Sequence, residues 1–73
     1  MQKIYTKIDQ VSGNVIALAA DDVAYGELAI VSTAQGDALA EVIRIEGDLV
    51  FLQVYSGGAG ISTRDEVRFL GYG

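Results

Sequence analysis

The chain has 73 residues, which allows one domain at most, and a domain of this size buries only about 60% of the surface of its unfolded chain. It contains no cysteine and no histidine, which excludes a disulfide framework and the two commonest soft metal ligands. Ten acidic residues against five basic ones give a formal net charge of −5, which repels phosphate backbones and anionic lipid surfaces. We therefore expect a single domain over residues 1–73, with no nucleic-acid partner.

No segment predicts insertion into a membrane. No apolar run approaches the roughly 20 residues that cross a bilayer, and the N-terminal residues lead directly into an alternating pattern without the core of a signal peptide. We expect a cytoplasmic protein without direct membrane contact.

The first half of the chain alternates with period two between turn signals. Residues 3–10 predict a half-buried strand, with Ile4, Thr6 and Ile8 on one face. The Gly13 turn leads to a strand over residues 15–20 that is apolar on both faces. Asp21 and Asp22 end this strand as a solvated turn, because the pair lacks the spacing of a calcium-binding loop. No metal site is expected.

The middle of the chain predicts three further strands. Residues 27–33 form one, with Leu28 and Ile30 facing inward and Glu27 outward. Residues 39–46 and 49–55 form a hairpin around the tight turn at Gly47 and Asp48. A helix over residues 36–45 is the alternative, since apolar residues also recur there at helical spacing, but the β-branched content and the flanking Gly-Asp signals favour a strand.

The glycine-rich segment "VYSGGAGIST", residues 54–63, raises the question of a phosphate-binding loop. A P-loop needs a lysine before its Ser/Thr and a helix after it, whereas here Ile61 stands in the lysine's place and residues 66–70 alternate as a sixth strand, with Val67 and Phe69 on one face. We interpret the glycines as a connection between strands.

Six short strands with glycine or acidic turns predict an all-β fold, a small closed six-stranded β-barrel. Closure is favoured because an open sheet would expose two edges and the chain has no proline to protect them. Catalysis is not expected: the serines and threonines have no evident base, and adjacent carboxylates in a strand point to opposite faces. We expect no catalytic residue, no cofactor-binding residue and no cofactor.

Several stretches together resemble the N-terminal β-barrel domain of the non-catalytic, B-type subunit of V-type and A-type rotary ATP synthases (ATPases). They are "YTKIDQVSGNVI" (residues 5–16), "VAYGELAIV" (23–31), "EVIRIEGDLVFLQVYSGGAGIST" (41–63) and "VRFLG" (67–71). "IRIEGD" and "QVY" are also similar to the catalytic subunit, but "GIST" followed by "VRFLG" favours the non-catalytic one. The chain departs from the family at Gly58-Ala59, where threonine or serine is common, and it stops at Gly73, where the family continues into its ATPase core.

The resemblance implies an assembly role in the non-catalytic subunit of a proton- or sodium-translocating ATPase. Its barrels join those of the catalytic subunits in a crown on the head of a peripheral, membrane-associated complex, and the isolated domain is a monomer or a weak oligomer. The alternative is a stand-alone barrel that binds a small ligand at residues 57–63 or a protein partner. The positions that match the family's turns are Gly13, Tyr25, Gly26, Glu27, Gly47, Asp48, Gly58, Gly60, Ile61 and Gly71.

Overall fold

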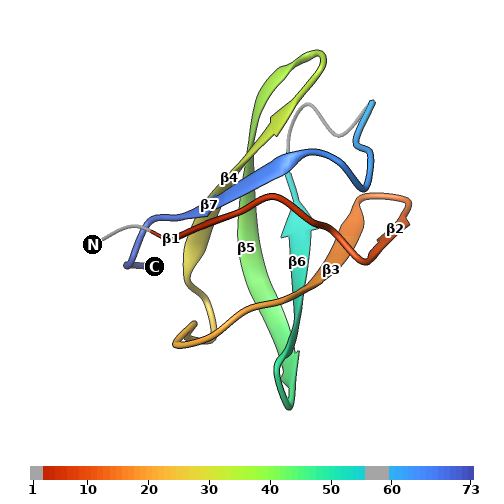
Figure 1. The fold of residues 1–73 in the computed structure, drawn as a ribbon. Helices are drawn as coiled ribbons and strands as arrows, with labels where there is room; N and C mark the ends of the chain where they lie inside the picture. The colour runs from red at the N-terminus through yellow and green to blue at the C-terminus, as the bar shows by residue number, and fades with distance from the viewer. Residues whose placement is uncertain (1–2, 56–59) are drawn as a thin grey trace.

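One antiparallel sheet forms the domain (Figure 1). The computed structural model describes residues 3–55 and 60–73, and no helix in these ranges is long and apolar enough to cross a membrane. Its seven strands lie in the order β1-β7-β4-β5-β6-β3-β2. They are β1 (Lys3–Tyr5), β2 (Gln10–Ser12), β3 (Val15–Ala19), β4 (Leu28–Thr33), β5 (Gly36–Glu46), β6 (Leu49–Val54) and β7 (Glu66–Phe69). The all-β prediction is confirmed.

The prediction of a closed six-stranded barrel is wrong in strand number and in closure. The sheet curls, but it is not closed by a continuous ladder, because β1 and β2 stand at its two ends. The predicted first strand over residues 3–10 is divided between these two short strands. At the division the backbone bonds change partner, since the Ile8 N–H donates to the Thr63 carbonyl at 3.1 Å and the Asp9 N–H donates to the Ala17 carbonyl at 2.8 Å.

Side chains span the seam between β1 and the turn after β3. The Lys3 Nζ donates to the Asp21 carbonyl at 2.8 Å and lies 3.3 Å from the Asp22 carboxylate. The Asp21 N–H donates to the Tyr5 hydroxyl at 3.0 Å. Polar side chains of β1 therefore make the link that a backbone ladder would make in a closed barrel.

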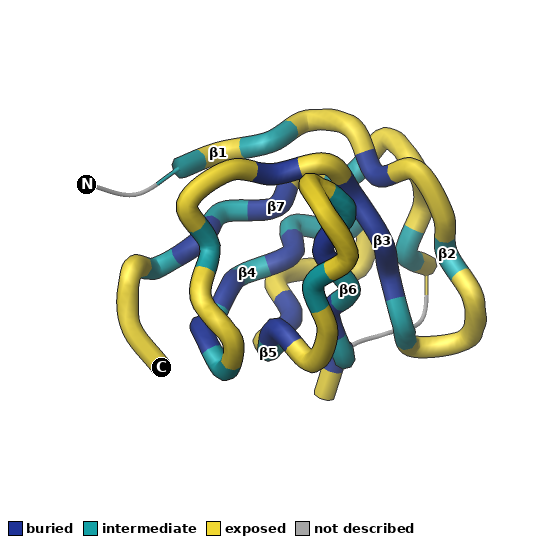
Figure 2. The backbone as a smooth tube through the Cα atoms, turned by 90° about the horizontal axis from the view of Figure 1, so that it is seen from below, coloured by how far each residue is buried: buried dark blue, intermediate teal, exposed yellow. Residues whose placement is uncertain are grey.

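Small side chains lie beside large ones across the interior. Phe69 stands opposite Ala29, which stands opposite Ala40, which in turn pairs with Val54. All four are buried, and Figure 2 shows buried positions alternating with intermediate ones along β4 and β6. The small residues let a narrow sheet curl around its core.

The predicted facings of two strands are reversed in the structure, and Glu27, expected to face outward just before β4, is buried. On β4, Ala29 and Val31 are buried, whereas Leu28 and Ile30, expected inward, are only partly buried on the outer face. On β1, Ile4 is 55% exposed while Tyr5 lies against the core, its ring 5.6 Å from that of Phe69 in an edge-to-face contact. Both faces of these strands carry apolar or aromatic side chains, so alternation alone did not reveal which face is inside.

The remaining strand predictions are confirmed. β3, β6 and β7 lie where expected, and Val67 and Phe69 are both buried. Residues 36–45 form strand β5, not a helix, and the hairpin turns at Gly47 and Asp48. Within the hairpin, the register of β5 against β6 shifts between Val42 and Arg44, so Ile43 interrupts the regular pairing of the two strands.

The seam predicts a specific effect of removing one hydroxyl. Tyr5→Phe keeps the ring contact with Phe69 but removes the acceptor of the Asp21 N–H, so we expect a loss of about 1 kcal/mol in the free energy of unfolding. Urea unfolding measures it. Tyr25→Phe, at a ring that is 71% exposed, is the matched control and should change stability far less. Equal effects of the two substitutions would contradict this account of the seam.

Candidate assembly surface

The predicted turn glycines adopt left-handed backbone conformations wherever the structure describes them. At the hairpin, Gly47 has φ = 62° at the first position of a two-residue turn. Type II′ turns favour glycine at this position because it adopts a positive φ without strain. Asp48 follows it, and its carbonyl accepts the Ala20 N–H at 2.9 Å, which ties the hairpin to the end of β3. Gly58 lies outside the described residues. Positive φ values are also found at Gly13, Gly26, Gly60 and Gly71.

The end of the glycine-rich connection satisfies its own polar groups. The Asp65 carboxylate accepts the Ser62 N–H at 2.8 Å, and the Ser62 hydroxyl accepts the Arg64 N–H at 3.2 Å. Ile61, just before this turn, packs against the core. An anion at this turn would have to displace the Asp65 carboxylate, so the geometry disfavours phosphate there.

A surface groove of about 380 Å³ lies elsewhere, along the seam. The alternative of a small ligand was placed at residues 57–63, of which 57–59 lie outside the described residues, and the lining includes none of residues 60–63. The groove contains an exposed pair in which the Lys7 Nζ lies 3.8 Å from the Asp9 carboxylate. Among the described residues, no group of three or more acidic side chains is placed to hold a metal ion. The groove is lined by Ile4, Tyr5, Thr6, Lys7, Asp9 and Ala19.

Large apolar side chains gather on the outer face beside β5. Leu39 and Ile43 point outward from this strand and are 39% and 37% exposed. The Tyr55 N–H donates to the Leu39 carbonyl at 2.8 Å, and the Gly26 N–H donates to the Val42 carbonyl at 2.9 Å, so the backbones of Tyr55 and of Gly26, the residue after Tyr25, lie beside the same strand. We define the β5 outer patch as Tyr25, Leu39, Ile43 and Tyr55.

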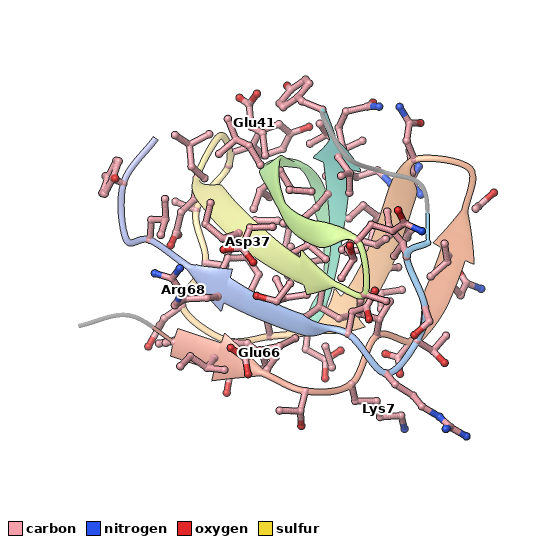
Figure 3. The ribbon with its side chains drawn as sticks, turned by 90° about the horizontal axis from the view of Figure 1, so that it is seen from above. Lys7, Asp37, Glu41, Glu66 and Arg68 are labelled. Carbon is pink, nitrogen blue, oxygen red and sulfur yellow. The ribbon has the colours of Figure 1, made fainter. Side chains whose placement is uncertain are left out.

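One carboxylate lies within the β5 outer patch. Glu41, between Leu39 and Ile43 on β5, accepts a short hydrogen bond from the Tyr55 hydroxyl. Figure 3 shows Glu41 at one rim of the domain, with Lys7 at the opposite rim and Arg68 and Glu66 along β7. The patch thus combines exposed apolar and aromatic groups with a carboxylate that is paired to Tyr55, a composition found at protein interfaces.

The sequence did not indicate this patch. Nothing in the alternation of residues 39–46 showed that Leu39 and Ile43 lie on the outer face. The signal that was available is the small size of Ala38 and Ala40, which fit the narrow interior of a small barrel.

The fold and its turns agree with a known family. The profile of the ATP synthase alpha/beta family, beta-barrel domain, matches residues 8–71. The chain belongs to this family. Its relatives include the "V-type ATP synthase beta chain" of Treponema denticola, 61% identical over 71 residues, and "V-type ATP synthase beta chain 1" of Treponema pallidum, 60% identical over 73 residues. The corresponding chain of Borrelia turicatae is 54% identical over 72 residues.

These ATP synthase chains are much longer than the domain. The alignments cover 97%, 100% and 99% of this chain, but only 16%, 17% and 17% of the respective relatives. The resemblance to a barrel domain of a V-type ATP synthase is thereby confirmed over nearly every residue. The activities and partners of the longer chains belong to those proteins.

The Tyr55–Glu41 contact predicts a pH effect. The hydrogen bond to Glu41 raises the pKa of Tyr55 above its ordinary value of 10.0, and burial and the charge of Glu41 act in the same direction. A pKa that is raised on folding contributes stability that is complete below the unfolded pKa and is lost as the pH rises through the folded pKa. The contribution of this contact should therefore disappear in strongly alkaline solution.

We expect Glu41→Gln to lower the pKa of Tyr55, because the substitution removes the charged acceptor. NMR titration of the ring carbon that bears the hydroxyl measures it. Glu46→Gln makes the same chemical change in a side chain that pairs with Arg44 and should leave the Tyr55 titration in place. A Tyr55 curve unaffected by Glu41→Gln would show that the contact does not persist in solution.

Proposed function

We propose that this domain is an assembly module of the non-catalytic subunit of a V-type rotary ATP synthase, located in the cytoplasm on the head of the membrane-associated complex. Its task is to pack side by side with homologous barrels, above all with those of the catalytic subunits. The parent complex performs the ATP chemistry, and this domain contributes contacts within the head. The transported ion is a property of other parts of that complex.

The observation that carries this proposal is the β5 outer patch. Leu39 and Ile43 project from a strand that is paired with β4 on one side and with β6 on the other, so the patch sits on a rigid support. Tyr25 and Tyr55 are 71% and 56% exposed, and aromatic rings of this kind contribute disproportionately to binding when an interface covers them. A domain with so small a core also gains stability when a partner covers apolar surface.

The names of the relatives support the choice of partner. They are beta chains of V-type ATP synthases, and the matched family includes the alpha and beta chains of ATP synthases. Homologous barrels share the same curled sheet, so an outward apolar strand on one barrel can meet the outer face of the next around a ring. Isolated, the domain should be monomeric or weakly associated, since the remaining contacts of such a ring involve other domains.

A substitution in the patch tests the proposal. We expect Leu39→Asp to weaken association with the barrel domain of the matching catalytic chain by at least about tenfold, since a buried unpaired carboxylate costs more than about 1.4 kcal/mol. Sedimentation velocity over a concentration series measures it. Ile4→Asp places the same carboxylate on an exposed apolar residue of β1, at the far end of the sheet order, and is the matched control.

Two outcomes would contradict the proposal. The first is no association between the unmodified barrels at high concentration. The second is equal weakening by Leu39→Asp and Ile4→Asp, which would place the contact away from β5. Circular dichroism of both variants checks that each remains folded.

A further inference from the structure

Among the residues that the structure describes, one charged residue is buried, and this is Glu27. The sequence predicted that its side chain would point outward. Glu27 is 8% exposed, and its two carboxylate oxygens bind different parts of the chain. Oε1 accepts the Ala24 N–H at 3.0 Å, and Oε2 accepts the Gly71 N–H at 2.9 Å. Gly71 is 44 residues further along the chain, so this side chain joins the turn before β4 to the C-terminal segment.

Backbone bonds meet at the same corner. The Glu27 carbonyl accepts the Val42 N–H at 2.9 Å, which ties the corner to β5. The Leu70 N–H donates to the Leu28 carbonyl at 2.9 Å, and the Leu28 N–H donates to the Tyr72 carbonyl at 2.8 Å. The chain beyond the end of β7 at Phe69 therefore runs alongside the start of β4.

Gly73 shows how close this packing is. A Cβ added to Gly73 would lie 2.7 Å from the Gly26 carbonyl oxygen, a contact that requires the backbone to shift. Gly73 thus lies directly against the turn at residues 24–27. Figure 2 shows the end of the chain on the same side of the domain as the start of β1.

A carboxylate is suited to this position for a physical reason. A buried charge is costly unless hydrogen bonds compensate it, and bonds from backbone N–H groups to a carboxylate are stronger than bonds between neutral groups. Gly71 is exposed and lies beyond the last strand, so its N–H has the Glu27 carboxylate as partner where a sheet residue would have a carbonyl. Glutamine in the place of Glu27 would turn an amide N–H₂ group, which cannot accept a hydrogen bond, toward the N–H of either Ala24 or Gly71.

We propose that Glu27 is a latch that holds residues 70–73 against the turn at residues 24–27. The latch makes the C-terminal segment a fixed extension of the sheet, so that a domain following Gly73 leaves the barrel in one direction. The consequence for a following domain rests on the proposed function, whereas the latch itself is a property of this chain. Glu27 acts here as a positioning residue and takes no part in the β5 outer patch.

Hydrogen exchange in the unmodified chain is the first test. We expect the Gly71 amide to exchange at least about tenfold more slowly than in an unstructured peptide, although the residue is exposed. NMR of the 73-residue chain measures it without any partner. Exchange of Gly71 at the unstructured rate would overturn the latch at once, and would leave the proposed assembly role unaffected.

Substitutions provide the second test. Glu27→Gln should accelerate Gly71 exchange about tenfold, while exchange of the core amide of Leu52 changes much less. Gly73→Ala should loosen the same segment without altering the carboxylate, because the added Cβ collides with Gly26. The control is Glu46→Gln, the same chemical change at an exposed surface pair, which should leave Gly71 exchange unchanged.

The comparison between Gly71 and Leu52 decides between a latch and a general loss of stability. Equal acceleration at both amides in Glu27→Gln would show that the residue acts on the whole fold, and would overturn the latch. If Glu27→Gln does not fold, the unmodified chain decides, because a Gly71 amide that exchanges there at the unstructured rate overturns the latch.

Discussion

The narrow interior of the curled sheet constrains the rest of the domain. Inward positions on β4 and β5 hold Ala29, Val31, Ala38, Ala40 and Val42, because a sheet of this curvature leaves little volume between strands that face one another. Larger apolar residues of the same two strands are left on the outer face. A chain of 73 residues cannot bury them within itself. The surface that we propose for assembly is thus a physical consequence of the size of the core.

Two sets of polar contacts hold the ends of the open sheet: the seam between β1 and the turn after β3, and the corner where Glu27 bonds to Ala24 and Gly71. At the seam, Lys3 and Tyr5 reach the turn after β3 with side chains, since no backbone ladder joins the two ends. At the corner, a carboxylate joins the C-terminal segment to the start of β4. Polar contacts at these two places supplement a core too small to position the chain ends by packing alone. Each contact links segments that are far apart in the sequence.

The loop that suggested nucleotide chemistry has a structural explanation in its described part. Asp65 already accepts the amide that an anion would need at Ser62, and Ile61 is packed against the core. The side chains with unusual environments, Glu27 and Tyr55, are each explained by a bonded partner within the chain. The functional interest of the domain therefore lies in its outer face and in the C-terminal segment, residues 70–73.

The sequence by itself determined the β class, the hairpin at Gly47 and Asp48, the shared face of Val67 and Phe69, and the family. The β class, the hairpin and the shared face depend on local turn chemistry and on period-two alternation, which neighbouring residues are enough to specify, whereas the family rests on the resemblance of several stretches. Only the tertiary structure decided that Leu28 and Ile30 face outward, that Glu27 is buried and that residues 3–10 divide into two strands. Where both faces of a strand are apolar, the volume that distant strands leave in the interior decides which face is buried. A carboxylate can be buried only where hydrogen-bond donors compensate its charge, and the donor here is the N–H of Gly71, which is remote in the sequence.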